Sequence, residues 1–390
     1  GLGHISSLLP LARWFLHAGH SVAMAVKDLS KTSALAAEGD DALVWFQAPM
    51  WIPIIRTRTP PANFSEMLFY SGFLDADMLL GLVKGWHSLF DAFKPDLLVF
   101  DHSPVAILAS HGLNIKRVSF GNSFFIPPNQ SPPPSFRTWE KHPAKRLEHS
   151  TYITLTTANK LLKSFNRPPL RQLTDLYRLD RHFLKCFPEL DAYSQRNNPD
   201  LEYIGTCTIT DQGCAPRWLK SSEKRIFAYL KCGYEAIETL LTLLVNSDHS
   251  LIIYCPGLSS ELQKKVINSG NTLSETPLNF DRTLPQCDLV INHAGLGTVS
   301  SVLLAGVPQL CLPIFAEQQI NAMNTKKLGC GNYLLPADIA TKFSVLVEKL
   351  TNDIEMAQAC SAHAERHSSY SINQMLASTY KTCFELVTSD

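Results

Sequence analysis

The chain alternates between short apolar runs and longer stretches in which apolar residues recur at helical spacing. Short apolar runs are typical of strands that are buried on both faces of a parallel sheet. Helical patterns such as Leu8–Ala18 and Pro104–His111 lie between them. This alternation indicates an α/β fold with doubly wound parallel sheets. The predicted strands are Ser21–Val26, Ala42–Ala48, Asp96–Asp101, Lys116–Phe120, Arg225–Leu230, Ser250–Cys255, Asp288–His293 and Pro308–Ile314.

The same alternation occurs in each half of the chain, and 390 residues are more than one ordinary core needs. We therefore expect two Rossmann-like domains that face a cleft, one formed by residues 1–205 and one by residues 206–369. Polar and turn residues between Asp191 and Pro216 predict the linker. A last helix is expected over Tyr370–Val387, and Pro127–Ser135 predicts a surface loop.

Composition narrows the class of protein. The chain is 45% hydrophobic and 18% charged with a formal charge of zero, which leaves little for nucleic acid binding by counterion release. No stretch reaches the roughly 20 apolar residues of a membrane helix, and the first residues lack the features of a signal peptide. The ten cysteines form no C-x-x-C pair and lie mostly in apolar runs, so we expect reduced thiols in a cytoplasmic protein rather than disulfides or a metal site.

The most informative segment runs from Asp288 to Gly331. It predicts a strand, a tight glycine turn, a helix, a second strand and a polar loop that opens another helix. A turn of this kind aims backbone N–H groups and the positive end of a helix at one point, where a phosphate can bind. Glu317 and Gln318 follow the next strand and should lie at the same carboxyl edge of the sheet.

This segment resembles the nucleotide-sugar-binding motif of the family 1 glycosyltransferases, which have the GT-B fold. The family pattern runs roughly His-Gly-Gly-x-Gly-Thr-x-x-Glu-Ala-Leu, then Gly-Val-Pro, then Pro-x-x-x-Asp-Gln-x-x-Asn-Ala. The matching stretches here are His293–Thr298, Gly306–Pro308, and Pro313 with Glu317–Ala322. The match is long, ungapped and in order, and it is most similar to the bacterial branch that glycosylates small lipophilic natural products.

The resemblance implies a donor site for a UDP- or dTDP-sugar with no metal cofactor. In this interpretation Gly295 and Gly297 allow close approach of the diphosphate, His293 and Thr298 add polar groups, and the Glu317-Gln318 pair contacts the sugar. Alternative roles remain open: His293 as a polar strand cap, and Glu317 as an acid placed at a helix N-terminus.

The chain departs from the family at several donor positions. Ser301 stands where the family has a ribose-binding Glu, and Pro277 where many members stack the base on a Trp. Backbone atoms near Leu278 are one candidate replacement for holding the base. Lys231 is either a positive charge for the diphosphate or a solvated loop lysine.

The resemblance also extends to a catalytic pair in the first domain. Gly3-His4, a helix, and then Gly19-His20-Ser21-Val22 are similar to the family's opening motif, in which the first histidine is the general base of an inverting reaction. Asp101 ends a predicted strand and matches the aspartate that orients this base, although it could also cap the following helix. In the family a strand precedes this motif, so we expect it upstream of Gly1, and the last helix is expected to return to the first domain.

The acceptor side is indicated only by aromatic residues in and near the region from Met50 to Phe93. Trp51, Phe69, Phe73 and Phe124 are the candidate acceptor-binding residues, and core packing is the equal alternative. Such a region also allows weak association with a membrane surface.

The sequence therefore predicts an inverting, metal-independent glycosyltransferase that acts on a hydroxyl of a small lipophilic acceptor. Two alternatives stay open: a catalytically silent homologue that acts as a binding or partner protein, which Ser301 and Pro277 favour, and a nucleotide-sugar epimerase on the same fold. Retention of His4 and Asp101 favours the transferase, because a binding protein needs no general base.

Overall fold

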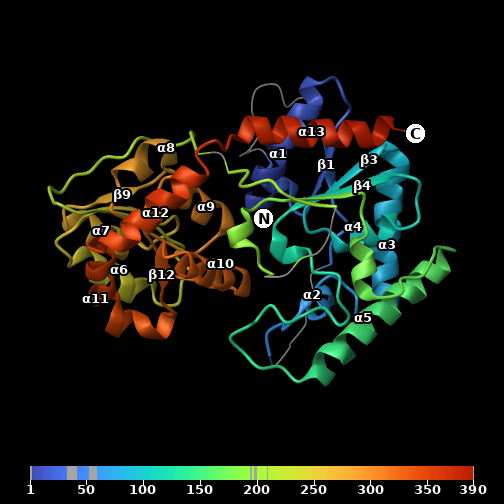
Figure 1. Ribbon diagram of the computed structural model, residues 1–390, viewed down its shortest axis with the longest axis horizontal. Coiled ribbons are helices and arrows are strands. Elements are labelled where there is room, and N and C mark those ends of the chain that lie inside the picture. Colours follow the sequence, from blue (N-terminus) through green and yellow to red (C-terminus); the bar gives the residue numbers. More distant parts are fainter. Residues whose placement is uncertain are drawn as a thin grey trace. The chain divides into compact units, whose positions relative to one another are not determined.

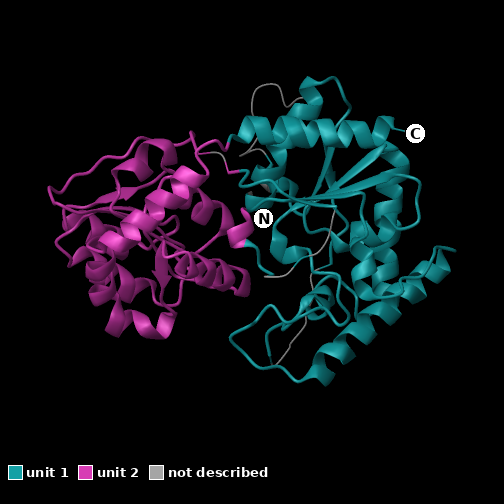
Figure 2. Ribbon diagram, viewed as in Figure 1, with its two compact units in different colours: residues 1–186, 191–207, 371–390 teal, residues 187–190, 208–370 magenta. Residues whose placement is uncertain are grey.

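The computed structural model describes residues 2–32, 42–51, 59–193, 196, 200–208 and 210–389. It consists of helices and parallel strands in the order shown in Figure 1. The chain forms two compact units (Figure 2): unit 1 comprises residues 1–186, 191–207 and 371–390, and unit 2 comprises residues 187–190 and 208–370. The expected boundary at 205/206 differs from this division mainly in residues 187–190, which belong to unit 2. Parts of the expected linker and of the region from Met50 to Phe93 lie outside the described residues.

Unit 1 contains two parallel sheets. One pairs β1 with β2, and the other has the order β3-β4-β5-β6. Four of these strands were predicted from their apolar runs, whereas β5 and β6 were not. The strands are β1 (Ala23–Val26), β2 (Val44–Gln47), β3 (Leu97–Phe100), β4 (Lys116–Gly121), β5 (Arg181–Leu184) and β6 (Leu201–Tyr203).

Three helices of unit 1 begin at residues whose side chains cap them. Asn63 caps α2, Asp75 caps α3 and Ser371 caps α13, each by accepting a hydrogen bond from a first-turn N–H. The first helix begins at Leu2, earlier than predicted, so His4 lies in its first turns. The α-helices are α1 (Leu2–His17), α2 (Phe64–Phe69), α3 (Ala76–Phe93), α4 (Pro104–Ser110), α5 (Ala144–Ser164) and α13 (Ile372–Thr388).

The C-terminal helix α13 is part of unit 1, where it runs beside α1 (Figure 1). The Tyr380 hydroxyl lies 3.1 Å from His20 Nε2, and the Tyr380 ring packs edge-on against Phe15. These contacts give His20 a structural role between α1 and α13.

The edges of β1 and β3 that face each other carry no strand partner among the described residues. A cavity of about 1320 Å³ lies between them, and residues of α1, α3 and α13 also line it. An unpaired strand edge presents a row of backbone N–H and C=O groups. The cavity is therefore lined on two sides by unpaired backbone groups.

Unit 2 is one six-stranded parallel sheet with the order β12-β11-β10-β7-β8-β9. The predicted strands of this half are all present, while the short edge strands β9 and β12 were not predicted. The strands are β7 (Arg225–Tyr229), β8 (Ser250–Tyr254), β9 (Thr272–Ser274), β10 (Leu289–Asn292), β11 (Gln309–Cys311) and β12 (Gly331–Tyr333). The α-helices are α6 (Ile237–Val245), α7 (Ser260–Asn268), α8 (Phe280–Thr283), α9 (Leu296–Leu304), α10 (Ala316–Lys327), α11 (Ile339–Thr351) and α12 (Ile354–Arg366).

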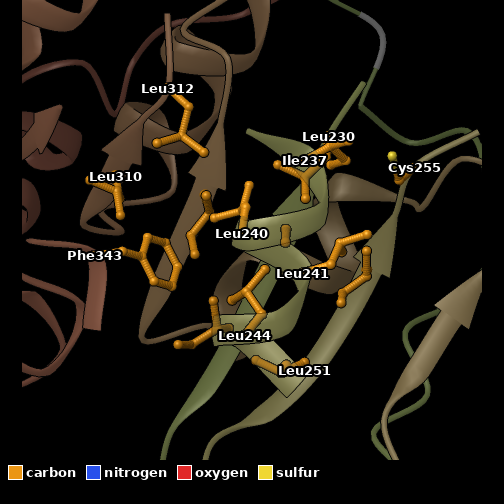
Figure 3. Close-up of a cluster of buried hydrophobic side chains, with 14 of the residues drawn as sticks. Leu230, Ile237, Leu240, Leu241, Leu244, Leu251, Cys255, Leu310, Leu312 and Phe343 are labelled. Carbon is orange, nitrogen blue, oxygen red and sulfur yellow. The ribbon is translucent and has the colours of Figure 1, made fainter. Parts of the chain in front are cut away.

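Both faces of the unit 2 sheet are buried, as strands without polar alternation require. On one face, Leu240, Leu241 and Leu244 of α6 pack with Phe343 of α11 against the strands (Figure 3). On the other face, Phe227 and Val290 pack with residues of α9 and of the segment around α8. Neighbouring residues of one strand thus enter different cores, which fixes the register of the sheet.

All ten cysteines are free thiols. No helix among the described residues combines the length and the apolarity needed to cross a membrane.

Candidate active site

A histidine–aspartate pair lies in unit 1, at the carboxyl end of the strands. His4 Nδ1 lies 3.0 Å from Asp101 Oδ2, and Asp101 directly follows β3. The Asp101 side chain is 1% exposed, whereas that of His4 is 44% exposed. The aspartate thus fixes one ring nitrogen of His4, and Nε2 is left for a substrate. Ser103 is the residue at the N-cap of α4, so capping that helix is not the role of Asp101.

A lysine that the sequence analysis did not single out completes this cluster. Lys185 directly follows β5, and its Nζ lies 2.9 Å from Asp101 Oδ2. It also donates to the hydroxyl of Ser7, which stands where the resembling family has a proline. Recognition of β5 as a strand would have identified Lys185, because a polar residue that follows this strand must lie at the same sheet edge as Asp101.

The charges around Asp101 keep it ionised. Burial alone would raise the pKa of the carboxyl group, but Lys185 and then His4 outweigh that effect and hold the pKa far below its ordinary value of 3.8. An ionised aspartate holds the His4 ring in one orientation and stabilises the imidazolium that forms when the ring accepts a proton.

The residues beside the pair are aromatic. His102 has a positive φ of 42° and stacks on Phe125, with ring centroids 3.8 Å apart. Burial lowers the pKa of His102 to about 3, so this ring stays neutral and does not compete with His4 as a base. The Phe125 ring also lies 5.9 Å from the His4 ring, which makes it the aromatic neighbour of the candidate base.

The predicted acceptor residues do not gather in one place. Trp51 lines the cavity that His4 and Asp101 also line. Phe73 is 0% exposed and Phe124 is buried, so both pack in the interior of unit 1. Phe69 lines a separate shallow hollow beside α5. Phe73 and Phe124 therefore follow the alternative interpretation of this region, which is core packing. Phe125, rather than Phe124, lies against the catalytic pair.

In unit 2, His293 joins three strand ends. Its Nε2 accepts a hydrogen bond from the Lys231 backbone N–H (2.9 Å), and its Nδ1 lies 2.7 Å from the Leu312 carbonyl oxygen. This pairing requires the proton on Nδ1, and burial lowers the pKa of His293, which keeps the ring neutral. With both nitrogens occupied, His293 has no N–H for an anion in this arrangement. The geometry favours the strand-cap role for this residue.

The glycine turn leads directly into the N-terminus of α9. Gly295 is the N-cap residue, and a methyl group placed on it would meet nothing within 4 Å. A methyl group on Gly297 would instead collide with the Thr208 hydroxyl. Gly295 therefore leaves room in front of the helix, whereas Gly297 is required by packing. Thr298 lies half-buried in the first turn of this helix.

The remaining positions of the motif are held by internal hydrogen bonds. The Ser301 hydroxyl donates to the Gly297 carbonyl one turn earlier (3.0 Å), and the Gln318 side-chain oxygen accepts from the Ile314 N–H (2.8 Å) at the start of α10. Asn321 Nδ2 donates to the Ala294 carbonyl (3.0 Å) and ties α10 to the glycine turn, where Ala294 has a φ of 55°. These contacts shape the turn from within.

Two charged residues lie beside these helix ends. Glu317 is half-buried in the first turn of α10. Lys231 is exposed, and its Nζ lies 5.9 Å from the centroid of the Phe315 ring, next to Glu317 in the sequence. The end of β7 and the start of α10 thus bring one cation and one carboxylate near the glycine turn.

The segment expected to hold the base is also internally paired. The Cys214 N–H donates to the Pro277 carbonyl (2.9 Å), and the Cys214 carbonyl accepts from the Asn279 N–H (2.9 Å). Leu278 lies between these bonds with its side chain buried in the unit 2 core. The backbone groups on both sides of Leu278 are therefore already used.

Comparison with known proteins shows a likeness to one family in the C-terminal part of the chain. Residues 238–377 match the family described as erythromycin biosynthesis protein CIII-like, C-terminal domain. The match begins in unit 2 and ends within α13. The predicted GT-B fold and the likeness to glycosyltransferases are confirmed, while the roles of the individual site residues stay predictions.

The relatives of this GT-B chain include enzymes named for natural products. It is 40% identical over 76 residues to elloramycin glycosyltransferase ElmGT of Streptomyces olivaceus, which covers 20% of this chain and 19% of that protein. It is 37% identical over 67 residues to TDP-daunosamine transferase DnrS of Streptomyces peucetius, or 17% of this chain and 16% of that one. The chain thus matches less than a fifth of the length of these curated relatives.

The likeness of fold extends over the whole chain. The calicheamicin glycosyltransferase CalG4 superposes with a TM-score of 0.71 at 15% identity, and covers 100% of this chain and 97% of its own. The kitacinnamycin glycosyltransferase gives 0.68 at 17% identity, with coverage of 96% and 94%. These structures establish the GT-B fold of the chain.

Proposed function

We propose that this protein transfers a sugar from a nucleoside diphosphate to a hydroxyl group of a small lipophilic acceptor, with inversion at the anomeric carbon. The observation that carries the proposal is the His4–Asp101 pair: a half-exposed imidazole held at 3.0 Å by a buried carboxylate. A protein that only binds a ligand has no need of such a pair.

The geometry of the pair suits a general base. Asp101 holds Nδ1, so the proton on that nitrogen leaves the Nε2 lone pair free to accept the proton of the acceptor hydroxyl. The oxygen then attacks the anomeric carbon, the bond from that carbon to the diphosphate oxygen breaks, and the diphosphate leaves with the electron pair. The imidazolium is stabilised by the ionised Asp101, and it later gives up its proton to water.

On the donor side, we assign the diphosphate to the N-terminus of α9. Gly295 leaves space there, and the first-turn N–H groups and helix dipole favour an anion. Lys231 supplies an exposed positive charge nearby, and Glu317 is the residue assigned to the sugar hydroxyls. Fixed dipoles and a lysine are a sufficient means of stabilising the leaving group, so we propose that transfer needs no divalent cation.

On the acceptor side, we propose a polycyclic or macrocyclic alcohol or phenol. Relatives of this chain are named for elloramycin and daunosamine transfer, and others are sterol 3-beta-glucosyltransferases. Trp51 and Phe125 are the aromatic residues placed to contact an acceptor next to His4. The inner part of the large cavity, between β1 and β3, is not assigned to the acceptor, since strand edges line it. A cytoplasmic location stays a prediction.

The test is transfer itself. Purified protein is incubated with UDP- and dTDP-sugars and a panel of lipophilic alcohols and phenols, and nucleoside diphosphate release and glycoside formation are measured, with the anomeric configuration of the product determined by NMR. We expect an inverted glycoside, a rate that added Mg²⁺ or Mn²⁺ does not raise, and a loss of at least about 100-fold in His4→Gln, within the usual contribution of a general base.

His20→Gln is the matched control, because His20 contacts Tyr380 of α13 rather than Asp101. Wild-type turnover in His4→Gln would exclude His4 as the base. Donor binding without any transfer by the wild type would instead identify a silent homologue.

A further inference from the structure

Three side chains that belong to neither predicted site gather in unit 2. Glu189 lies on the short 3-10 helix Pro188–Leu190, and His363 and His367 lie four residues apart at the end of α12. This spacing places both imidazoles on one face of the helix. One donor atom from each of the three residues lies within 4.8 Å of the others.

The histidine at the centre of this cluster is buried without a hydrogen bond. His363 is 2% exposed, and neither of its ring nitrogens has a partner. Oxygen Oε2 of Glu189 is likewise buried and unpaired. A buried polar atom without a partner costs about 1–3 kcal/mol, and proteins rarely leave several together. A neutral imidazole has one N–H and one nitrogen with a lone pair, and the lone pair of His363 is therefore available to a cation.

We propose that Glu189, His363 and His367 form a binding site for Zn²⁺. Two imidazole nitrogens and one carboxylate oxygen are a donor set that zinc accepts, with a fourth position for water. In a tetrahedral zinc site, neighbouring donor atoms lie about 3.4 Å apart, as follows from Zn–N and Zn–O distances of about 2.0–2.2 Å. His367 Nε2 and Glu189 Oε1 are 3.2 Å apart and share a hydrogen bond, which zinc would replace at nearly the same spacing.

The surroundings of the two imidazoles are largely aromatic. Phe187 packs against both imidazoles, with its ring centroid 4.3 Å from that of His367 and 6.3 Å from that of His363. The Tyr370 ring packs edge-on against Phe187, with ring centroids 5.3 Å apart. An apolar surround of this kind limits the access of water to the site.

One cation competes for the carboxylate. Arg366 donates to Glu189 Oε1 at 3.2 Å, and its side chain is 59% exposed. An exposed arginine loses little when it turns into solvent, since surface ion pairs contribute about 0–1 kcal/mol. Zinc would then replace Arg366 as the partner of Glu189.

A metal at this place would join two segments that are distant in the sequence. Residues 187–190 belong to unit 2, while the residues on both sides of them belong to unit 1. Zinc would fasten this four-residue segment to α12 and stabilise the folded protein in proportion to its concentration. The proposal is independent of the glycosyltransferase function, because none of its ligands is assigned to transfer.

The experiment measures zinc binding by the full-length chain after dialysis against a chelator. Calorimetry and elemental analysis give affinity and stoichiometry, and Co²⁺ in place of Zn²⁺ reports tetrahedral geometry by its visible absorption. We expect one equivalent of zinc, a rise in melting temperature, and affinity weakened by more than about 100-fold in Glu189→Gln and His367→Gln, since even the loss of a second-sphere partner costs about 10–100-fold. Circular dichroism checks the fold of each variant.

Two further variants make the test decisive. His249→Gln alters another buried histidine, which lies 2.9 Å from Glu348 but has no third donor among the residues that the structure describes, and should bind zinc like the wild type. Arg366→Gln removes only the exposed competitor, and should bind zinc more tightly. The proposal is overturned if the wild type binds no stoichiometric zinc, if Glu189→Gln binds it equally well, or if Arg366→Gln binds it more weakly.

Discussion

Lys185 offers the most direct test of how the catalytic cluster is held together. The change is Lys185→Met, which keeps an unbranched side chain of similar length and removes the charge. Lys185 and Asp101 are both almost fully buried, and Nζ lies 2.9 Å from Oδ2. Removal of one partner from a buried ion pair costs about 3–5 kcal/mol, because the remaining charge is left without compensation. We therefore expect unit 1 of Lys185→Met to lose about that much of its free energy of unfolding.

The pH dependence of this loss has a definite sign. In the wild type the pKa of Asp101 lies below its ordinary value of 3.8, so its contribution to stability is complete above that pH and is lost as the pH falls through the lower, folded value. In Lys185→Met, the lysine no longer opposes the rise in the pKa of Asp101 that burial causes. Protonation of Asp101 then removes the uncompensated buried charge and reduces the loss of stability. The difference in stability between the two proteins should be largest near neutral pH and shrink toward pH 4.

The assay is urea unfolding of both proteins at several pH values, followed by tryptophan fluorescence and circular dichroism. The double variant Lys185→Met/Asp101→Asn removes both charges and should recover most of the loss. Equal stability of wild type and Lys185→Met at neutral pH, or a loss that the double variant does not recover, would refute this reasoning.

Three further predictions concern the donor motif. Gly295→Ala should fold like the wild type but bind donor about 10- to 100-fold more weakly, because its methyl group occupies the space in front of α9 and displaces a charge-assisted hydrogen bond. Gly81→Ala, also in open space, is the control. Unchanged affinity of Gly295→Ala for UDP or dTDP in calorimetry would argue against a phosphate at the N-terminus of α9. Ser301→Ala should bind donor within about twofold of the wild type, because the hydroxyl is already bonded inside its own helix and such bonds add little; a larger loss in the same titration would show that Ser301 contacts the ribose. His293→Ala should lower the free energy of unfolding by about 2–4 kcal/mol, since it leaves the Lys231 N–H and the Leu312 carbonyl unpaired; full stability combined with lost donor binding would restore His293 as a direct phosphate ligand.

The sequence predicted the strands that form the centre of each sheet. Runs such as Ile226–Ala228 and Leu251–Ile253 are buried on both sides, so their apolar character is continuous and easily recognised. The missed strands β9 and β12 are three residues long and lie at sheet edges, where polar residues such as Thr272 and Asn332 are tolerated. Strands this short, with polar residues among them, cannot be distinguished from loops by their sequence.

The site was predicted where a motif is local and missed where partners come from distant segments. His4 and Asp101 were paired from their resemblance to the family's catalytic histidine and aspartate, although 97 residues separate them. Lys185 was missed because β5 contains His182 and Arg181 and does not look like a buried strand. The two backbone partners of His293 are 62 and 19 residues away, and only the fold shows that they occupy both ring nitrogens.

The facing edges of β1 and β3 have a consequence for the kind of segment that unit 1 can bind. Each edge offers main-chain hydrogen bonds, and an extended segment of about four residues with small or apolar side chains suits the pairing pattern of both edges by β-augmentation. Such a segment would be held by its main chain, so the size of its side chains would decide binding more than their identity.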